Sequence, residues 1–209
     1  MYNINEHIIR ELNNIYGGSE KKKTVILDDG SKYLLKLSDP VREANSTLSY
    51  INNAYSEYLG CKIAESIGLP VQKVILGEYT YTGRNNETHK RPACLCRDIT
   101  YDTGLKMIEL DKLALSDYNS DSKKITFKEQ NELINSIKGI DNTALHDFYY
   151  DLFIFDALVG NTDRHNGNIS ILVNENETCG GICPVYDCGS SLLPMVSDEQ
   201  LPLKNKDNL

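Results

Sequence analysis

The chain has 209 residues, of which 40% are hydrophobic and 25% are charged, and its net charge at pH 7 is −8. This is the composition of an ordinary globular protein, long enough for one core or for two small lobes that share a cleft. The negative charge argues against non-specific binding to nucleic acid or to an anionic membrane, and no segment predicts a secretory signal or a membrane span.

The first third of the chain predicts a helix, a strand hairpin and a second helix. Residues 1–15 have apolar side chains at roughly helical spacing, which predicts a short leading helix. Residues 24–27 and 32–37 predict two strands, and the Asp-Gly between them favours a tight turn. Residues 52–67 predict a helix because apolar side chains recur there at four-residue steps, namely Tyr55, Leu59, Ile63 and Ile67.

The middle of the chain changes from strand patterns to helix patterns. Residues 71–82 and 90–99 predict two strands joined by a polar turn. We place a lobe boundary after Ile99, so that residues 1–99 form an N-lobe and residues 100–209 form a mainly helical C-lobe.

Helices and one hairpin are predicted for the C-lobe. Residues 105–117, about 127–139, and 143–159 are the helical candidates, and the last has a strongly apolar face. Residues 169–173 and 182–186 predict a hairpin, which would place Asn168 at the start of one strand and Asp187 at the end of the other.

The six cysteines do not have the spacing of a zinc site, because no Cys-x-x-Cys pair is present. We expect free thiols, buried or partly buried, in a reducing compartment. The expected location is therefore the cytoplasm, and export as an effector by a route without a sequence signal is the alternative.

One loop and the short segment that follows it predict phosphate chemistry. Asp163 and Asn168 lie five residues apart in a loop rich in Gly and Asn, and Asp187 begins an Asp-Cys-Gly sequence. Carboxylate and amide oxygens are the ligands that Mg²⁺ prefers, and this Asp-x4-Asn and Asp-x-Gly pattern recurs in phosphoryl-transfer enzymes. Asp163 is the candidate that orients an attacking hydroxyl, and Asn168 and Asp187 are the candidate metal ligands.

Three earlier features complete the expected machinery. Lys36 lies on a predicted strand and can reach nucleotide phosphates, and Glu57 lies on the next helix and can hold that lysine in place. Small residues that let backbone N–H groups approach phosphates precede this strand as Gly17, Gly18 and Ser19. Each feature alone has a simpler interpretation, such as a solvated lysine, a surface acid or a turn. Their order along the chain favours the catalytic interpretation.

Two segments carry a resemblance to a known family. Residues 161–168 (Asn-Thr-Asp-Arg-His-Asn-Gly-Asn) and 186–192 (Tyr-Asp-Cys-Gly-Ser-Ser-Leu) resemble the signature blocks of HipA-like serine/threonine kinases. The similarity is greatest to the CtkA-like branch of pro-inflammatory kinases and spans about residues 16–194. It implies a protein-kinase-like α+β fold with an antiparallel β N-lobe and a mainly helical C-lobe. It also implies ATP and Mg²⁺ as ligands, a protein substrate with a Ser/Thr acceptor, a toxin or effector role, and an antitoxin partner.

The resemblance also implies roles for individual residues. Asp163 would be the catalytic base, with Lys36 and Asn168 completing the catalytic set, and Asn168 and Asp187 would hold the metal. The adenine would meet the strand that runs through Cys96, Arg97 and Asp98. Arg164 and His165 would brace the loop rather than react, and His165 is also a candidate for the nucleotide-binding set. Phosphate-loop serines are regulated by phosphorylation in this family, so Ser19 is a candidate for autophosphorylation.

The resemblance leaves two alternatives open. Family members continue further beyond the metal-binding aspartate than this chain, which ends about twenty residues after Asp187. We therefore expect a truncated C-lobe, or one that is completed by another chain. The alternatives to a protein kinase are a kinase-fold phosphotransferase for a lipid or small molecule, and a catalytically silent nucleotide-binding module.

Overall fold

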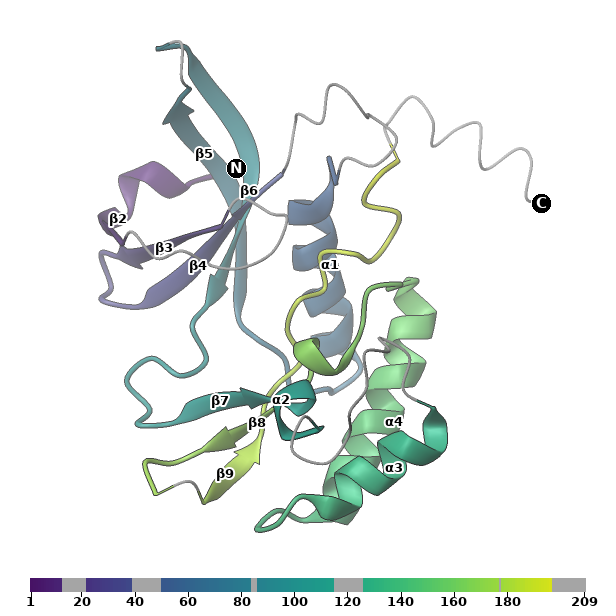
Figure 1. Ribbon diagram of the computed structural model, residues 1–209. Coiled ribbons are helices and arrows are strands. Elements are labelled where there is room, and N and C mark those ends of the chain that lie inside the picture. Colours follow the sequence, from purple (N-terminus) through teal and green to yellow (C-terminus); the bar gives the residue numbers. More distant parts are fainter. Residues whose placement is uncertain (13–21, 39–49, 84–85, 115–125, 177, 197–209) are drawn as a thin grey trace, which may run out of the picture.

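The structure is a computed structural model that describes residues 1–12, 22–38, 50–83, 86–114, 126–176 and 178–196. Figure 1 shows two lobes, an upper one built on a curled sheet with helix α1, and a lower one built on a small sheet with helices α2 to α4. Within these residues, no helix is both long enough and apolar enough to cross a membrane. The fold is α+β, as predicted.

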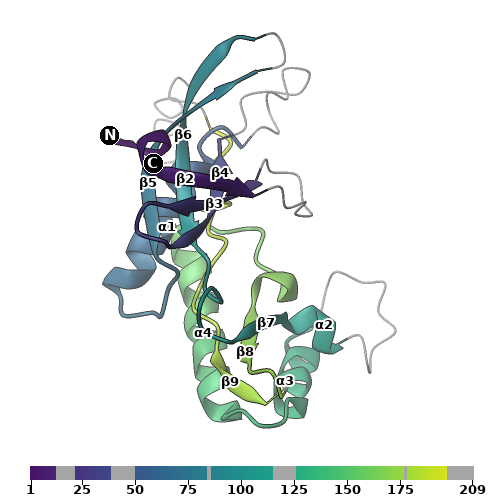
Figure 2. The same ribbon diagram turned by 90° about the vertical axis from the view of Figure 1, so that its left-hand side faces the viewer.

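The upper sheet has six strands among the described residues, in the order β1-β5-β6-β4-β3-β2. The β1–β5 pair is parallel and the other neighbours are antiparallel. Figure 2 shows that the sheet curls, with the β5–β6 hairpin crossing the direction of β2, β3 and β4. The strand bounds are β1 Tyr2–Asn3, β2 Ile8–Leu12, β3 Lys22–Leu27, β4 Lys32–Leu37, β5 Val74–Thr82 and β6 Thr88–Arg97.

The helix predicted for residues 1–15 is wrong over its described part. This segment forms β1, a single 3-10 turn (η1, Ile4–Glu6) and β2. Strand pairing with β5 and β3 overrides the weak helical spacing, and Ile4 is fully buried in the core inside the curled sheet. Residues 13–15 lie outside the described residues.

The hairpin of β3 and β4 is confirmed. Its turn is closed by a hydrogen bond from the backbone N–H of Leu27 to the carbonyl of Ser31. Leu35 and Leu37 are buried in the core inside the curled sheet. Successive side chains of a strand point to opposite faces, so Lys36 lies on the other face.

The helix predicted for residues 52–67 is confirmed as α1, Asn53–Ser66. The four-residue apolar row that predicted it is not the buried face, because Leu59 and Ile67 are exposed. The buried face consists of small and polar side chains, namely Asn53, Ala54, Ser56, Glu57, Gly60, Cys61 and Ala64. Small side chains let α1 lie close to the segment it packs against, which matters for the site.

The lower lobe contains a strand where a helix was expected. Residues 106–109 form β7 (Lys106–Glu109), and only Leu110–Ala114 form the short helix α2. The strand forms because β7 pairs along its whole length with β8 (Ser170–Val173), an interaction that local periodicity does not reveal. Residues 115–117 lie outside the described residues. The helical predictions for about 127–139 and 143–159 are confirmed as α3, Phe127–Ser136, and α4, Asn142–Val159.

The predicted second hairpin is present with a different second strand. The partner of β8 is β9 (Cys179–Ile182), not residues 182–186. After Ile182 the chain leaves the small sheet, and Val185 forms a single parallel bridge with Val71 of the upper lobe. Asp187 consequently lies in this connecting segment, coloured yellow in Figure 1, which runs upward beside α1.

Helix α4 delivers the chain to the predicted catalytic loop. Its first turn is capped by the Asp141 carboxylate, which accepts hydrogen bonds from two backbone N–H groups. Its apolar face, with Phe148, Leu152 and Phe155, is buried as predicted. It ends at Gly160, whose left-handed backbone (φ +64°) turns the chain sharply out of the helix.

Two further sequence predictions concern the whole chain. All six cysteines lie in the described residues and are free, five of them buried, which confirms the thiol prediction. The predicted lobe boundary after Ile99 falls between β6 and β7, two strands that belong to different sheets, and it stays a prediction.

Candidate active site

The centre of the site is a buried ammonium group held by two carboxylates. The Nζ atom of Lys36, on β4, lies 2.8 Å from Oε2 of Glu57 and 2.6 Å from Oδ1 of Asp187. The side chain of Lys36 is 5% exposed, that of Glu57 is fully buried, and that of Asp187 is 28% exposed. Three sequence-predicted residues from distant parts of the chain therefore meet at one point.

The Asp187 carboxylate is stabilised in its ionised form. The charge of Lys36, followed by that of Lys22, holds the pKa of the Asp187 carboxyl well below its ordinary value, against the effect of burial. The residue also has a left-handed backbone (φ +58°), a region that Asp tolerates better than most residues but still with strain. An ionised, partly exposed carboxylate on a strained backbone is typical of a functional position.

A glycine brings α1 close enough for Glu57 to reach the site. A Cβ atom added at Gly60 would lie 2.7 Å from Cβ of Cys188, so no larger residue fits without movement of the chain. Cys188 directly follows Asp187, and Glu57 lies one turn before Gly60 on the same buried helix face. The close contact of helix and segment thus sets the positions of both carboxylates around Lys36.

The predicted catalytic loop places Asp163 next to Asn168. The Nδ2 atom of Asn168 donates a hydrogen bond to the backbone carbonyl of Asp163 at 3.2 Å. The loop is also shaped by Asn161, whose side-chain oxygen accepts from the backbone N–H of Asp163 at 3.2 Å. The Asp163 side chain is exposed and thus accessible to a substrate. Since the amide nitrogen of Asn168 is used inside the loop, its amide oxygen is the atom available to a metal.

Arg164 braces the loop through a buried ion pair. Its guanidinium donates two hydrogen bonds to Asp156 of α4, at 2.9 and 3.2 Å. It also donates to the carbonyls of Asn168, at 3.2 Å, and Tyr186, at 2.6 Å. Burial disfavours the charge of Arg164, but the hydrogen bonds and charge of Asp156 outweigh it and raise the pKa of Arg164. Arg164 therefore holds the backbone at Asn168, one metal-ligand candidate, and at Tyr186, which directly precedes Asp187, the other candidate.

Two more contacts fix the loop from other elements. The side-chain amide of Asn166 donates to Oε1 of Gln130, a buried residue of α3, at 2.9 Å. The hydroxyls of Tyr186 and Ser170 are 2.7 Å apart, and Tyr186 also donates to the carbonyl of Gly167 at 3.3 Å. Burial raises the pKa of Tyr186, so its phenol stays protonated and can donate.

His165 lies beside these contacts without a reacting partner in the described structure. Its Nδ1 atom accepts a hydrogen bond from the backbone N–H of Gly167 at 3.0 Å, and its side chain is exposed. This contact caps the 3-10 turn η3, Asn166–Asn168, which holds the amide of Asn168 in the loop. The geometry is that of a residue that shapes the loop.

Two of the remaining predicted residues lie on or directly after β6, the strand that pairs with the Lys36 strand β4. Cys96 is buried on β6, and Asp98 follows that strand, where its carboxylate lies 2.9 Å from Nζ of Lys32. The backbone N–H of Arg97 and that of Asp98 donate to the carbonyls of Lys73 and Lys32. Residues Gly17, Gly18 and Ser19 lie outside the described residues.

Sequence reasoning missed the importance of Asp156. It accepts three side-chain hydrogen bonds, two from Arg164 and one from Asn161 at 2.9 Å. A signal was present, because Asp156 directly follows the fully buried Phe155 in an apolar helix. An acid at such a position is rarely buried without a partner.

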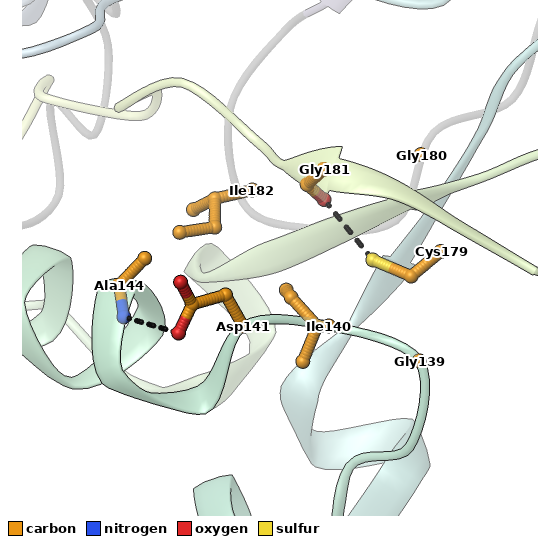
Figure 3. Close-up of a pocket in the computed structure, with 8 residues that line it drawn as sticks. All are labelled: Gly139, Ile140, Asp141, Ala144, Cys179, Gly180, Gly181 and Ile182. Carbon is orange, nitrogen blue, oxygen red and sulfur yellow. Dashed lines mark hydrogen bonds between the residues drawn. The ribbon is translucent and has the colours of Figure 1, made fainter.

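A pocket of about 420 Å³ lies elsewhere, at the far end of the lower lobe. Figure 3 shows it between the α3–α4 connection and β9, with Ile140, Ala144 and Ile182 in its wall. Its carboxylate, Asp141, is already used to cap α4. The pocket contains none of the predicted site residues, and the hydrogen-bonded network around Lys36 is the better candidate for chemistry.

The donor atoms of the network fit Mg²⁺. The carboxylate of Asp187 and the amide oxygen of Asn168 are hard oxygen donors, which suit this ion. No group of three or more His, Cys, Asp or Glu side chains suited to a metal occurs in the part of the chain that the structure describes. Mg²⁺ usually keeps several waters and binds together with substrate phosphates, so that two protein ligands suffice for it.

Comparison with known proteins identifies similar molecules. The family model for the HipA-like C-terminal domain matches residues 15–208. The serine/threonine-protein kinase CtkA of Helicobacter pylori is 32% identical in an alignment of length 205, which covers 93% of this chain and 58% of CtkA. The crystal structure of a Helicobacter pylori proinflammatory kinase CtkA matches with a TM-score of 0.72 at 28% identity, covering 89% of this chain and 61% of that one. The chain thus spans about three-fifths of the length of these relatives.

Removal of the Asp156 carboxylate should destabilise the protein strongly. The Asp156→Ala variant leaves the buried guanidinium of Arg164 without its ionic partner, which is expected to lower the free energy of unfolding by about 3–5 kcal/mol. Urea unfolding followed by circular dichroism measures this. The control is Glu65→Ala, which removes the exposed Lys62–Glu65 pair and should change the free energy by less than about 1 kcal/mol. Equal effects of the two substitutions would contradict the bracing role.

The Asp187 carboxyl should titrate at an unusually low pH. Because its pKa is lower in the folded than in the unfolded protein, its contribution to stability is complete above about pH 4 and is lost as the pH falls further. The ¹³C shift of its carboxyl carbon, followed by NMR, should show this. The Lys36→Met variant should raise the titration midpoint, because the nearest positive charge is gone. A midpoint at the ordinary value in the unsubstituted protein would refute the assignment.

Proposed function

The chain belongs to the family of HipA-like C-terminal domains, and we propose that it is an ATP- and Mg²⁺-dependent phosphotransferase that acts on serine or threonine of a protein. The observation that supports this most is the contact of Lys36 with both Glu57 and Asp187. A strand lysine held by a helix glutamate beside a metal-binding aspartate is the arrangement that phosphoryl transfer by kinases requires. The similarity to CtkA, which is named a serine/threonine-protein kinase, supports the same reaction type.

Each residue has a defined task in the proposed reaction. Asp163 accepts the proton of the attacking hydroxyl, a role that its exposed carboxylate permits. Lys36 binds nucleotide phosphates through its ammonium group, which Glu57 holds in position. Asn168 and Asp187 would hold Mg²⁺ through their side-chain oxygens. The bound ion would neutralise charge on the phosphates and orient them for in-line transfer.

The loop contacts support this chemistry by limiting motion. Positioning of the reacting groups provides most of the catalysis in phosphoryl transfer. Arg164 ties the carbonyl of Asn168 to that of Tyr186, which precedes Asp187, so that the two metal ligands are held relative to each other. His165 keeps the turn at Asn168 in shape through Gly167.

Nucleotide binding is expected to use the connection between the lobes. We propose that the adenine contacts backbone groups of the segment Cys96–Asp98. In the described structure the N–H groups of Arg97 and Asp98 already donate to protein carbonyls. The adenine amino group is a donor, so a carbonyl oxygen of this segment is the complementary partner. Gly17 and Gly18 would add backbone N–H contacts to the phosphates.

Substitution of Asp163 should separate transfer from binding. In assays with γ-labelled ATP, Mg²⁺ and generic protein acceptors, Asp163→Asn should lower the transfer rate by about 10²–10⁴-fold, because the proton acceptor is lost. ATP binding should remain, whereas Asp187→Asn should remove Mg²⁺-dependent binding. Asp147→Asn, an exposed position of α4, is the control with the same charge change.

The outcomes of this experiment separate the three candidate functions. Binding of ATP without transfer by the unsubstituted protein would indicate a catalytically silent module. Transfer to inositol lipids or small molecules but not to proteins would indicate the alternative phosphotransferase. Equal transfer by the unsubstituted protein and Asp163→Asn would refute the assigned base. A toxin or effector role, with an antitoxin partner, needs a separate experiment. Expression of the protein in cells should then arrest growth, and Asp163→Asn should abolish the arrest.

Autophosphorylation of Ser19 is part of the same proposal. A phosphate on Ser19 would carry a dianionic charge in the predicted phosphate-binding segment and would oppose binding of ATP phosphates. Mass spectrometry after incubation with Mg-ATP should find this phosphate, and Asp163→Asn should lack it. A phosphate absent from the unsubstituted protein would remove the regulatory role of Ser19 without affecting the transfer reaction.

A further inference from the structure

Strand pairing places Lys22 and Lys23, the described part of a run of lysines, on opposite faces of the upper sheet. Lys22 lies directly opposite Lys36 in the antiparallel β3–β4 pair. Directly opposite residues point to the same face, with Cβ atoms about 4.5–5.5 Å apart. Lys23 points to the other face, where its Nζ atom lies 3.0 Å from Glu11 and 3.1 Å from the hydroxyl of Tyr79. Lys22 is therefore the described residue of the run that shares the face of the candidate active site.

The opposition of two lysines requires an explanation. Like charges directly across two strands destabilise a sheet by a few tenths of a kcal/mol or more. Glu57 and Asp187 hold the ammonium group of Lys36, and Lys22 lies directly across the strand pair from that lysine, on the same face. Lys22 thus lies within electrostatic range of the candidate metal ligand.

Lys22 offsets part of the negative charge of the two carboxylates that hold Lys36, and so lessens the repulsion of an anionic ligand. Lys36 and Lys22 together balance the charges of Glu57 and Asp187. Without Lys22 these groups would carry a net negative charge, in a chain whose total charge is already −8. A complex of Mg²⁺ and ATP is itself negative and would be repelled by such a site.

We propose that Lys22 is a second phosphate-binding lysine, which contacts the nucleotide polyphosphate from β3 while Lys36 contacts it from β4. The proposal rests on the proposed function and adds a specificity-determining residue to it. An ammonium group is a compact donor of three hydrogen bonds that suits phosphate oxygens. The proposed contact of Lys22 is with phosphate oxygens only, so its loss should weaken the binding of ATP and not that of adenosine.

Calorimetric binding of Mg-ATP and adenosine to the full chain tests this role. Lys22→Met should weaken Mg-ATP binding about tenfold or more, the usual effect of losing a charge-assisted hydrogen bond, and adenosine binding should change less than about twofold. Lys22→Arg should restore most of the affinity. The control is Lys90→Met on β6, which removes the same charge from an exposed strand lysine paired with Glu78 at 2.6 Å.

Each other outcome overturns the proposal in a recognisable way. Equal weakening for Mg-ATP and adenosine would assign Lys22 a structural role only. If Lys22→Met and Lys90→Met weakened Mg-ATP binding equally, the effect would come from the total charge of the protein and not from a contact of Lys22. Unchanged Mg-ATP affinity in Lys22→Met, together with loss of binding in Lys36→Met, would refute the proposal and leave the proposed function intact. Binding of neither ligand by the unsubstituted protein would overturn both.

Discussion

The burial of the Lys36 ammonium group is the constraint on which the rest of the site depends. A charged group that is 5% exposed must be paired, because an uncompensated buried charge costs several kcal/mol. Its two partners come from α1 and from the segment after β9, so these elements must converge on β4. The close contact of Gly60 with Cys188 makes this convergence possible. It allows Glu57 and Asp187 to reach the same nitrogen. One ion-pair network thereby connects the two lobes.

A second buried cation performs the same task within the lower lobe. Arg164 is paired with Asp156 and uses its remaining donors on the carbonyls of Asn168 and Tyr186. Tyr186 directly precedes Asp187, so the two networks meet on adjacent residues. Because the backbone is fixed there, Asp187 is held in its left-handed conformation and its carboxylate keeps one direction. The geometry of the candidate site thus follows from two buried positive charges and the carboxylates that compensate them.

Three residues singled out from the sequence meet in the structure, whereas some of the elements around them were not predicted. Lys36, Glu57 and Asp187 could be assigned because their chemistry and order along the chain are specific, and the structure places them in contact. The strands at residues 2–12 and 106–109 were missed because pairing with distant strands, rather than local periodicity, determines them.

The same limitation applies to individual side chains. The role of Asp156 depends on a guanidinium eight residues later in the chain, and that of Lys22 on the register between two strands. Sequence spacing alone predicts neither the contact between Asp156 and Arg164 nor the register of the two strands. Side-chain chemistry could therefore be read from the sequence, whereas the partners of buried charges required the fold.

Helix α4 has two different faces, and the buried one supports the catalytic loop. Its buried face, with Leu152 and Phe155, holds Asp156 in position for Arg164. On the opposite face Phe153, Ile154 and Leu158 are 68%, 65% and 67% exposed, so the helix is apolar around most of its circumference. Helices of this kind are usually covered on both sides. The hydrogen bonds between α4 and the catalytic loop that support Asn161 and Arg164 are made by Asp156, on the buried side. The support that α4 gives to the loop therefore comes from the core of the lobe.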